Sequence, residues 1–225
     1  ISMPSISKLD RIRGSLLAGA VGDALGAPVE FMPIEDIVGQ FGAQGPNALE
    51  EGPYPAGSFT DDTQMTLFVA EGLIRTINRS KLSGAVPVGI DVMLHAHWRW
   101  LATQGLWPIG EVDPDLLSSW LTEISGLNEH RAPGRACISS LQSGEVGTLD
   151  NAINDSKGCG GVMRAAPAGA REEQCGDAPA ARRQVERGGG VAGEDHLLGG
   201  GRPQPAGDLG AGVLVGLGGL GAEGV

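Results

Sequence analysis

Four neighbouring side chains that carry oxygen donors are the first candidates for chemistry: Thr60, Asp61, Asp62 and Thr63. Adjacent carboxylates repel each other unless a cation or a hydrogen-bond donor lies between them. A ligand set made only of oxygens suits Mg²⁺ or Mn²⁺ rather than zinc. A purely structural alternative stays open. Ser58 followed by Asp61 fits the capping box of a helix N-terminus, where acidic side chains also complement the helix dipole.

Two further carboxylates precede this group. Glu30 stands between Val29 and Phe31, and a carboxylate in apolar surroundings has a raised pKa, as general acid or base chemistry requires. A solvated loop glutamate is the alternative interpretation. Asp23 lies within an otherwise apolar helical segment, where an unpaired carboxylate would be costly. We therefore expect Asp23 to accept hydrogen bonds from backbone or hydroxyl groups.

A glycine-rich turn near residue 160 is a candidate anion site. Its glycines would let backbone N–H groups approach a phosphate, and a helix beginning near Val162 would favour negative charge at its N-terminus. Lys157 adds positive charge. The turn is not a Walker A loop, because no Gly-Lys-Ser/Thr sequence follows. Its candidate binding residues are Ser156, Lys157, Gly158, Cys159, Gly160 and Gly161.

Two other polar pairs are better explained by structure than by chemistry. His95 and His97 would point to different faces of a helix, which argues against joint metal binding and favours packing or hydrogen bonding. Asp113 and Asp115 are typical of a helix start.

The composition limits the class of protein. The 225 residues carry 16 Lys and Arg against 27 Asp and Glu, a formal net charge of -11, and 41% are hydrophobic. This acidic balance argues against a nucleic-acid or anionic-membrane partner held by a broad basic surface. No uninterrupted apolar stretch is long enough for a membrane span, and the three cysteines form no CxxC pair. We expect a soluble cytoplasmic protein.

The elements that must position these residues are helices. Alternating strand patterns are scarce, so we predict an all-α fold, a compact multi-helix bundle. Gly14, Ala18, Gly22 and Gly26 recur every four residues and predict a smooth face for close helix contact. The predicted helices span residues 8–25, 33–41 (with Pro33 in the first turn), 61–77, 91–103, 113–124 and 132–141.

The C-terminal quarter differs in composition. Residues 170–225 contain 16 glycines and neither an aromatic residue nor a lysine. Such a stretch loses much backbone entropy on ordering and has few large side chains to compensate. We therefore divide the chain into an ordered domain, residues 1–169, and a low-order tail, residues 170–225. The tail is either a flexible extension or the product of a reading-frame shift near Gly169.

Taken together, these segments resemble the ADP-ribosylglycohydrolase family, the group that contains dinitrogenase reductase-activating glycohydrolase. The order and separation of the motifs contribute to the resemblance, which covers roughly residues 1–169. The residues that carry it are GSLLAGAVGDALG at 14–26, Glu30, FTDDTQM at 59–65, RWL at 99–101 and GCGGVMRAAP at 158–167.

The resemblance implies hydrolysis of the glycosidic bond between ADP-ribose and an acceptor, either a protein side chain or a small conjugate. It implies a binuclear Mg²⁺ or Mn²⁺ centre, with Thr60, Asp61 and Asp62 as ligands. Glu30 would be the general base or would position the water. The turn at 158–161 would line the diphosphate, with Ser156 and Lys157 nearby.

The family resemblance also implies a second acidic cluster, Asp-x-Asp-Thr, in the C-terminal part. Residues 170–225 contain no Asp-x-Asp sequence. With half of the ligands absent, we expect metal affinity to fall by orders of magnitude, so the chain can belong to the family and be inactive. Two other functions therefore remain open: a non-catalytic ADP-ribose-binding or structural protein, and another Mg²⁺-dependent hydrolase of nucleotide diphosphates.

Overall fold

The computed structural model describes residues 6–84, 89–148 and 151–169 of the chain. This part consists of helices and loops with no β-strand element, which confirms the all-α prediction. The predicted tail, residues 170–225, lies outside the described residues. The helices are α1 (Lys8–Gly26), η1 (Ala27–Val29), α2 (Ile34–Phe41), α3 (Asp61–Ser83), α4 (Gly89–Thr103), α5 (Pro114–Leu117), η2 (Ser125–Leu127), α6 (Arg135–Gln142) and α7 (Gly160–Met163).

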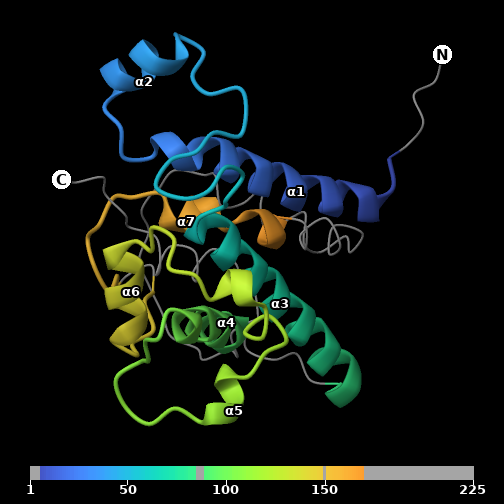
Figure 1. Ribbon diagram of the computed structural model, residues 1–225. Helices are drawn as coiled ribbons and strands as arrows, with labels where there is room; N and C mark the ends of the chain where they lie inside the picture. Colours follow the sequence, from blue (N-terminus) through green and yellow to red (C-terminus); the bar gives the residue numbers. More distant parts are fainter. Residues whose placement is uncertain (1–5, 85–88, 149–150, 170–225) are drawn as a thin grey trace, which may run out of the picture.

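Helix α3 organises the bundle. It contacts α1, α4 and α7, and α4 in turn contacts α5 and α6. Figure 1 shows α1 across one end of the bundle, α7 where α1 approaches the beginning of α3, and α2 at the periphery. The core between α3, α4 and α6 includes Phe68, Trp100 and Leu141, all fully buried. This packing fixes the N-terminus of α3 relative to α1 and α7. No helix in the described ranges has the length and hydropathy that a bilayer span needs.

Several helix boundaries differ from those predicted. Helix α3 continues to Ser83 and ends where Gly84 adopts a left-handed conformation with φ of 66°. The helix predicted over 113–124 is wrong beyond Leu117, because Ser118 is extended and the Ser119 hydroxyl accepts from the Leu121 N–H instead. The helix predicted from residue 132 begins only at Arg135, and Pro33 precedes α2 as its N-cap.

Among the residues that the structure describes, the glycine row of α1 does not make the close helix contact that we predicted. A Cβ atom built on Gly14, Gly22 or Gly26 would meet nothing within 4 Å among the described residues. Leu17 and Val21, on the same helix, are 67% and 55% exposed. The close approach between helices occurs instead at Gly72 of α3.

Replacing Gly72 with alanine is expected to destabilise the protein by about 1–2 kcal/mol, the strain of overpacking less the gain in helix propensity. The new Cβ would lie 2.7 Å from Met93 Cε and 2.9 Å from Ala96 Cβ of α4. The matched control is Gly14→Ala, which should raise stability by about 0.5–1 kcal/mol because no described residue lies within 4 Å of its added Cβ. Urea denaturation measures both; equal effects of the two variants would contradict the packing described for α3 and α4.

Candidate active site

Thr60 begins α3 and places two carboxylates in its first turn. The Thr60 side chain is the N-cap and accepts a hydrogen bond from the Asp62 N–H at 3.4 Å. The alternative of a capping box from Ser58 to Asp61 is therefore wrong in its N-cap, which lies two residues too early. Thr60 is still extended, and the helix begins only at Asp61.

Asp23 of α1 joins the two helices. Its carboxylate accepts from the backbone N–H groups of Thr60 and Thr63, at 2.9 and 3.1 Å. It also accepts from the hydroxyls of the same two threonines, at 2.7 and 2.5 Å. The predicted hydrogen bonding of Asp23 to backbone and hydroxyl groups is confirmed. This carboxylate holds the first turn of α3 against α1 and satisfies the Thr60 and Thr63 N–H groups, which lack a partner within the helix.

A cavity of about 690 Å³ opens beside this junction. Glu30, Thr60, Asp62 and Cys159 all line it, although they come from three separate segments of the chain. Small residues of α1, including Gly22 and Gly26, form one wall. Thr63, from the predicted oxygen-bearing group, also lines the cavity. Other lining residues were not predicted as site residues: Phe59, Thr66, Leu67, Met163 and Ala166.

Asp61 is placed differently from its neighbour Asp62. It is only 4% exposed and is not part of the cavity lining. Its Oδ2 accepts a hydrogen bond from the Gly134 N–H at 3.4 Å, and its own N–H donates to the Arg131 carbonyl oxygen at 3.0 Å. The structure therefore brings Glu30, Thr60 and Asp62 to one cavity and holds Asp61 behind them.

Burial and neighbouring carboxylates raise the pKa values of Asp61, Asp62 and Glu30. Burial, followed by repulsion from Asp62, raises the pKa of Asp61 to about 7. Burial and the charge of Asp23 raise the pKa of Asp62 to about 6, against the opposing effect of Arg164. Partial desolvation at the cavity rim, with Asp62 and Asp23, also raises the pKa of Glu30. The pKa of Glu30 is thus raised, as we predicted, and negative charge is disfavoured at Glu30, Asp61 and Asp62.

The stability of the metal-free chain is expected to fall as the pH rises from about 4 to about 7. The folded state holds a proton on Asp61 that the unfolded chain, with an ordinary carboxyl pKa, has already released. The stabilisation that this proton gives the folded state is fully present below about pH 4 and lost above about pH 7. It amounts to at most about 4 kcal/mol. Urea denaturation at several pH values measures it. Asp61→Asn should flatten the profile, whereas Asn at the exposed Asp36 should not; a profile unaffected by Asp61→Asn would contradict this assignment.

The glycine-rich turn contributes less of the cavity than predicted. Cys159 lines it, whereas Ser156, Lys157 and Gly158 are outside the lining. Gly160 and Gly161 are buried in α7, which begins at Gly160 rather than near Val162. Ser156 donates its backbone N–H to Asn154 Oδ1 at 3.0 Å, and the Lys157 side chain is exposed.

The donor types at the site suit a hard divalent cation, because Glu30, Thr60 and Asp62 all offer oxygen. Such a cation would relieve the repulsion from neighbouring carboxylates that raises the pKa values of Glu30 and Asp62. Within the described ranges, however, no group of three or more His, Cys, Asp or Glu side chains is arranged to hold a metal ion. The oxygen donors of the described residues therefore fit such a cation in kind, but by themselves they are too few to enclose it.

The remaining polar motifs have structural roles. The His97 ring is buried and its Nδ1 hydrogen-bonds to the Met93 carbonyl oxygen at 2.7 Å, while burial lowers its pKa to about 3. The His95 ring packs against Trp98, with centroids 5.3 Å apart. Asp113 caps α5 by accepting from the Asp115 N–H at 3.0 Å. These placements confirm the structural interpretation of both pairs.

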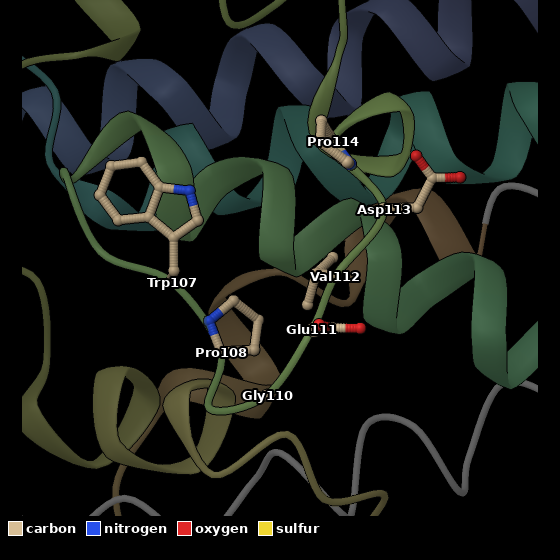
Figure 2. Close-up of a pocket in the computed structure, with 7 residues that line it drawn as sticks. All are labelled: Trp107, Pro108, Gly110, Glu111, Val112, Asp113 and Pro114. Carbon is tan, nitrogen blue, oxygen red and sulfur yellow. The ribbon is translucent and has the colours of Figure 1, made fainter.

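A second cavity of about 690 Å³ lies along the loop after α4. Figure 2 shows Trp107 at one end of this loop and Asp113 with Pro114 at the other. None of the residues predicted to do chemistry lines it. The cavity at the start of α3 is therefore the candidate active site.

Comparison with known proteins places the chain in a family. ADP-ribosylarginine hydrolase Tri1 of Pseudomonas putida (strain GB-1) is 32% identical over 138 residues, which are 59% of this chain and 34% of that protein. ADP-ribosyl-[dinitrogen reductase] glycohydrolase of Rhodospirillum rubrum is 44% identical over 68 residues, which are 28% of this chain and 22% of that protein. The chain thus matches about a third or less of the length of these curated relatives. No solved structure matches it significantly.

The sequence profile of one protein family matches most of the chain, from residue 4 to residue 193. The match continues past residue 169, where we predict the ordered domain to end, and that boundary remains a prediction. Because this match covers far more than half of the sequence, the chain belongs to the ADP-ribosylglycohydrolase family.

Proposed function

We propose that the chain is a metal-dependent hydrolase that cleaves the glycosidic bond of ADP-ribosylated protein or of small ADP-ribose conjugates. The observation that carries the proposal is the shared cavity. Glu30, Thr60, Asp62 and Cys159, all identified as candidate site residues in the sequence, line one cavity. Relatives named for hydrolysis of ADP-ribosylarginine and of ADP-ribosyl-dinitrogen reductase support the substrate class.

Thr60 and Asp62 are the residues of the cavity that would hold Mg²⁺ or Mn²⁺, with Asp61 directly behind them. When bound, such a cation would polarise the scissile centre and lower the pKa of a water. The chain's own contribution is to fix these oxygens. Asp23 holds the Thr60 backbone and hydroxyl, which sets the first turn of α3 against the cavity.

Glu30 is suited to accept the proton of the attacking water. It lies at the open rim of the same cavity, and its raised pKa brings it closer to neutrality, where a general base is most effective. The carboxylates of Glu30 and Asp62 would also stabilise the positive character that develops on the sugar as the acceptor departs.

The Cys159 turn would face the diphosphate. Cys159 lines the cavity, and Gly158 and Gly160 flank it, so no bulky side chain covers the backbone on either side of Cys159. The volume of about 690 Å³ falls within the range of ordinary ligand pockets.

The test is product analysis on the full chain with an ADP-ribosylated arginine peptide, in Mg²⁺, in Mn²⁺ and in chelator. The proposal predicts free ADP-ribose and unmodified peptide only when the cation is present. Release of AMP would instead indicate cleavage of the diphosphate. Calorimetric binding of ADP-ribose without any turnover would contradict hydrolysis and support the non-catalytic binding protein.

A further inference from the structure

Residues 129–134 hold the first turn of α3 from outside the cavity. The Asp61 N–H donates to the Arg131 carbonyl oxygen at 3.0 Å, and the Gly134 N–H donates to Asp61 Oδ2 at 3.4 Å. One turn later, Gln64 Nε2 donates to the Glu129 carbonyl oxygen at 2.9 Å. The loop thus forms hydrogen bonds with both the backbone N–H and the carboxylate of Asp61.

The Arg131 side chain anchors this loop to the segment that precedes α3. Its Nη1 donates to the Phe59 carbonyl oxygen at 3.2 Å. The guanidinium lies over the rings of Tyr54 and Phe59, 5.5 and 5.8 Å from their centroids, and pairs with Glu129. The Arg131 side chain is only 13% exposed. Cation–π contacts and charge-assisted hydrogen bonds are stronger in such a partly desolvated position than at a fully exposed one.

Ala132 shows that the loop is held under strain. With φ of 49° it is the one non-glycine residue of the described ranges in the left-handed region. That conformation is unfavourable for a residue with a Cβ, and the following Pro133 restricts Ala132 further. A strained residue persists only where its surroundings impose the conformation, and such residues gather at functional sites. Here the anchors on either side are Arg131 and Gly134.

We infer that Arg131 is a positioning residue of the active site, which imposes the left-handed turn at Ala132 and thereby holds the Asp61 carboxylate behind Asp62. The inference deepens the proposed function and rests on it for its catalytic meaning. Without the anchor, Ala132 relaxes to an ordinary conformation, the Gly134 N–H leaves Asp61, and the first turn of α3 loses its fixed orientation toward Glu30.

Amide hydrogen exchange on the full chain tests the anchor directly, without any turnover. In Arg131→Ala, the Asp61 and Gly134 amides are expected to exchange about tenfold faster or more, while core amides of α4 keep their rates. Alanine at the nearby exposed Arg135 is the matched control and should change neither amide. Glycine adopts a positive φ readily. The double variant Arg131→Ala/Ala132→Gly should therefore recover part of the lost protection.

Catalysis supplies the second readout. Arg131→Ala should lower kcat more than it raises KM, and Ala132→Gly should restore part of kcat in that background. Unchanged exchange at Asp61 and Gly134 in Arg131→Ala, or a failure of Ala132→Gly to restore any protection, would overturn the inference. If the wild-type chain releases no ADP-ribose, the proposed function fails, while the exchange measurements still decide whether Arg131 positions Asp61.

Discussion

Replacement of Glu30 with glutamine is expected to lower kcat for release of ADP-ribose by about 10²–10⁴-fold, the usual contribution of a positioned general base. Glutamine preserves the size and polarity of the side chain at the cavity rim and removes only its ability to accept a proton. Because Glu30 is charged next to Asp62 and Asp23, its loss should not destabilise the fold. Initial rates with an ADP-ribosylated arginine peptide measure the effect.

Glu35→Gln is the matched control for Glu30→Gln, since Glu35 is an exposed residue of α2 that does not line the cavity. Its kcat should equal that of the wild type. The activity of the wild type should also fall at acidic pH as Glu30 takes up a proton, and the glutamine variant should lose that limb of the profile. Equal kcat for Glu30→Gln and the wild type would remove Glu30 from the mechanism.

The largest loss of stability is expected from Glu71→Gln, at about 3–5 kcal/mol. Glu71 and Arg99 are each 2% exposed, and their side chains meet at 2.6 Å between α3 and α4. Arg75 and the Ser119 hydroxyl also donate to Glu71. Removal of the carboxylate charge would leave the Arg99 guanidinium buried without a counterion. Urea denaturation followed by circular dichroism measures the change in the free energy of unfolding.

An exposed ion pair provides the control for Glu71→Gln. Asp10 and Arg13 of α1 lie 4.0 Å apart and are more than half exposed, so Arg13→Gln should cost less than about 1 kcal/mol. In addition, Glu71→Met/Arg99→Met should recover much of the lost stability, because an apolar pair of similar volume avoids the buried charge. A loss for Glu71→Gln no greater than that for Arg13→Gln would show that the α3–α4 pair does not have the energetic role assigned to it.

The features that depend on local sequence pattern, or on the cost of burying a charged group, could be predicted from the sequence. Asp23 was predicted to accept hydrogen bonds because an unpaired carboxylate within an apolar helical segment is costly. In the structure it accepts four. The helical fold followed from apolar spacing. The boundaries were less accessible: nothing local distinguishes Ser58 from Thr60 as the N-cap, and the contacts that decide between them come from Asp23, 37 residues earlier.

The arrangement of the site depends on long-range contacts that no single-sequence pattern encodes. The different placements of Asp61 and Asp62 result from hydrogen bonds to Arg131 and Gly134, about seventy residues later. Phe59 could have been found, because it directly precedes the acidic group. The loop at Arg131 left no such signal. The glycine row of α1 was predicted to serve a close helix contact. Small residues also suit the wall of a cavity, and Gly22 and Gly26 line one here.

The central claim, that the cavity at the start of α3 binds ADP-ribose, is tested most directly by alkylation of Cys159. This thiol is exposed and lines the cavity, whereas Cys137 is buried in the core and serves as the internal reference. Mass spectrometry of the full chain after timed treatment with iodoacetamide gives the rate at each cysteine. We expect ADP-ribose to slow alkylation of Cys159 in a saturable manner and to leave Cys137 unchanged. A Cys159 rate that is the same at every ADP-ribose concentration would contradict the account.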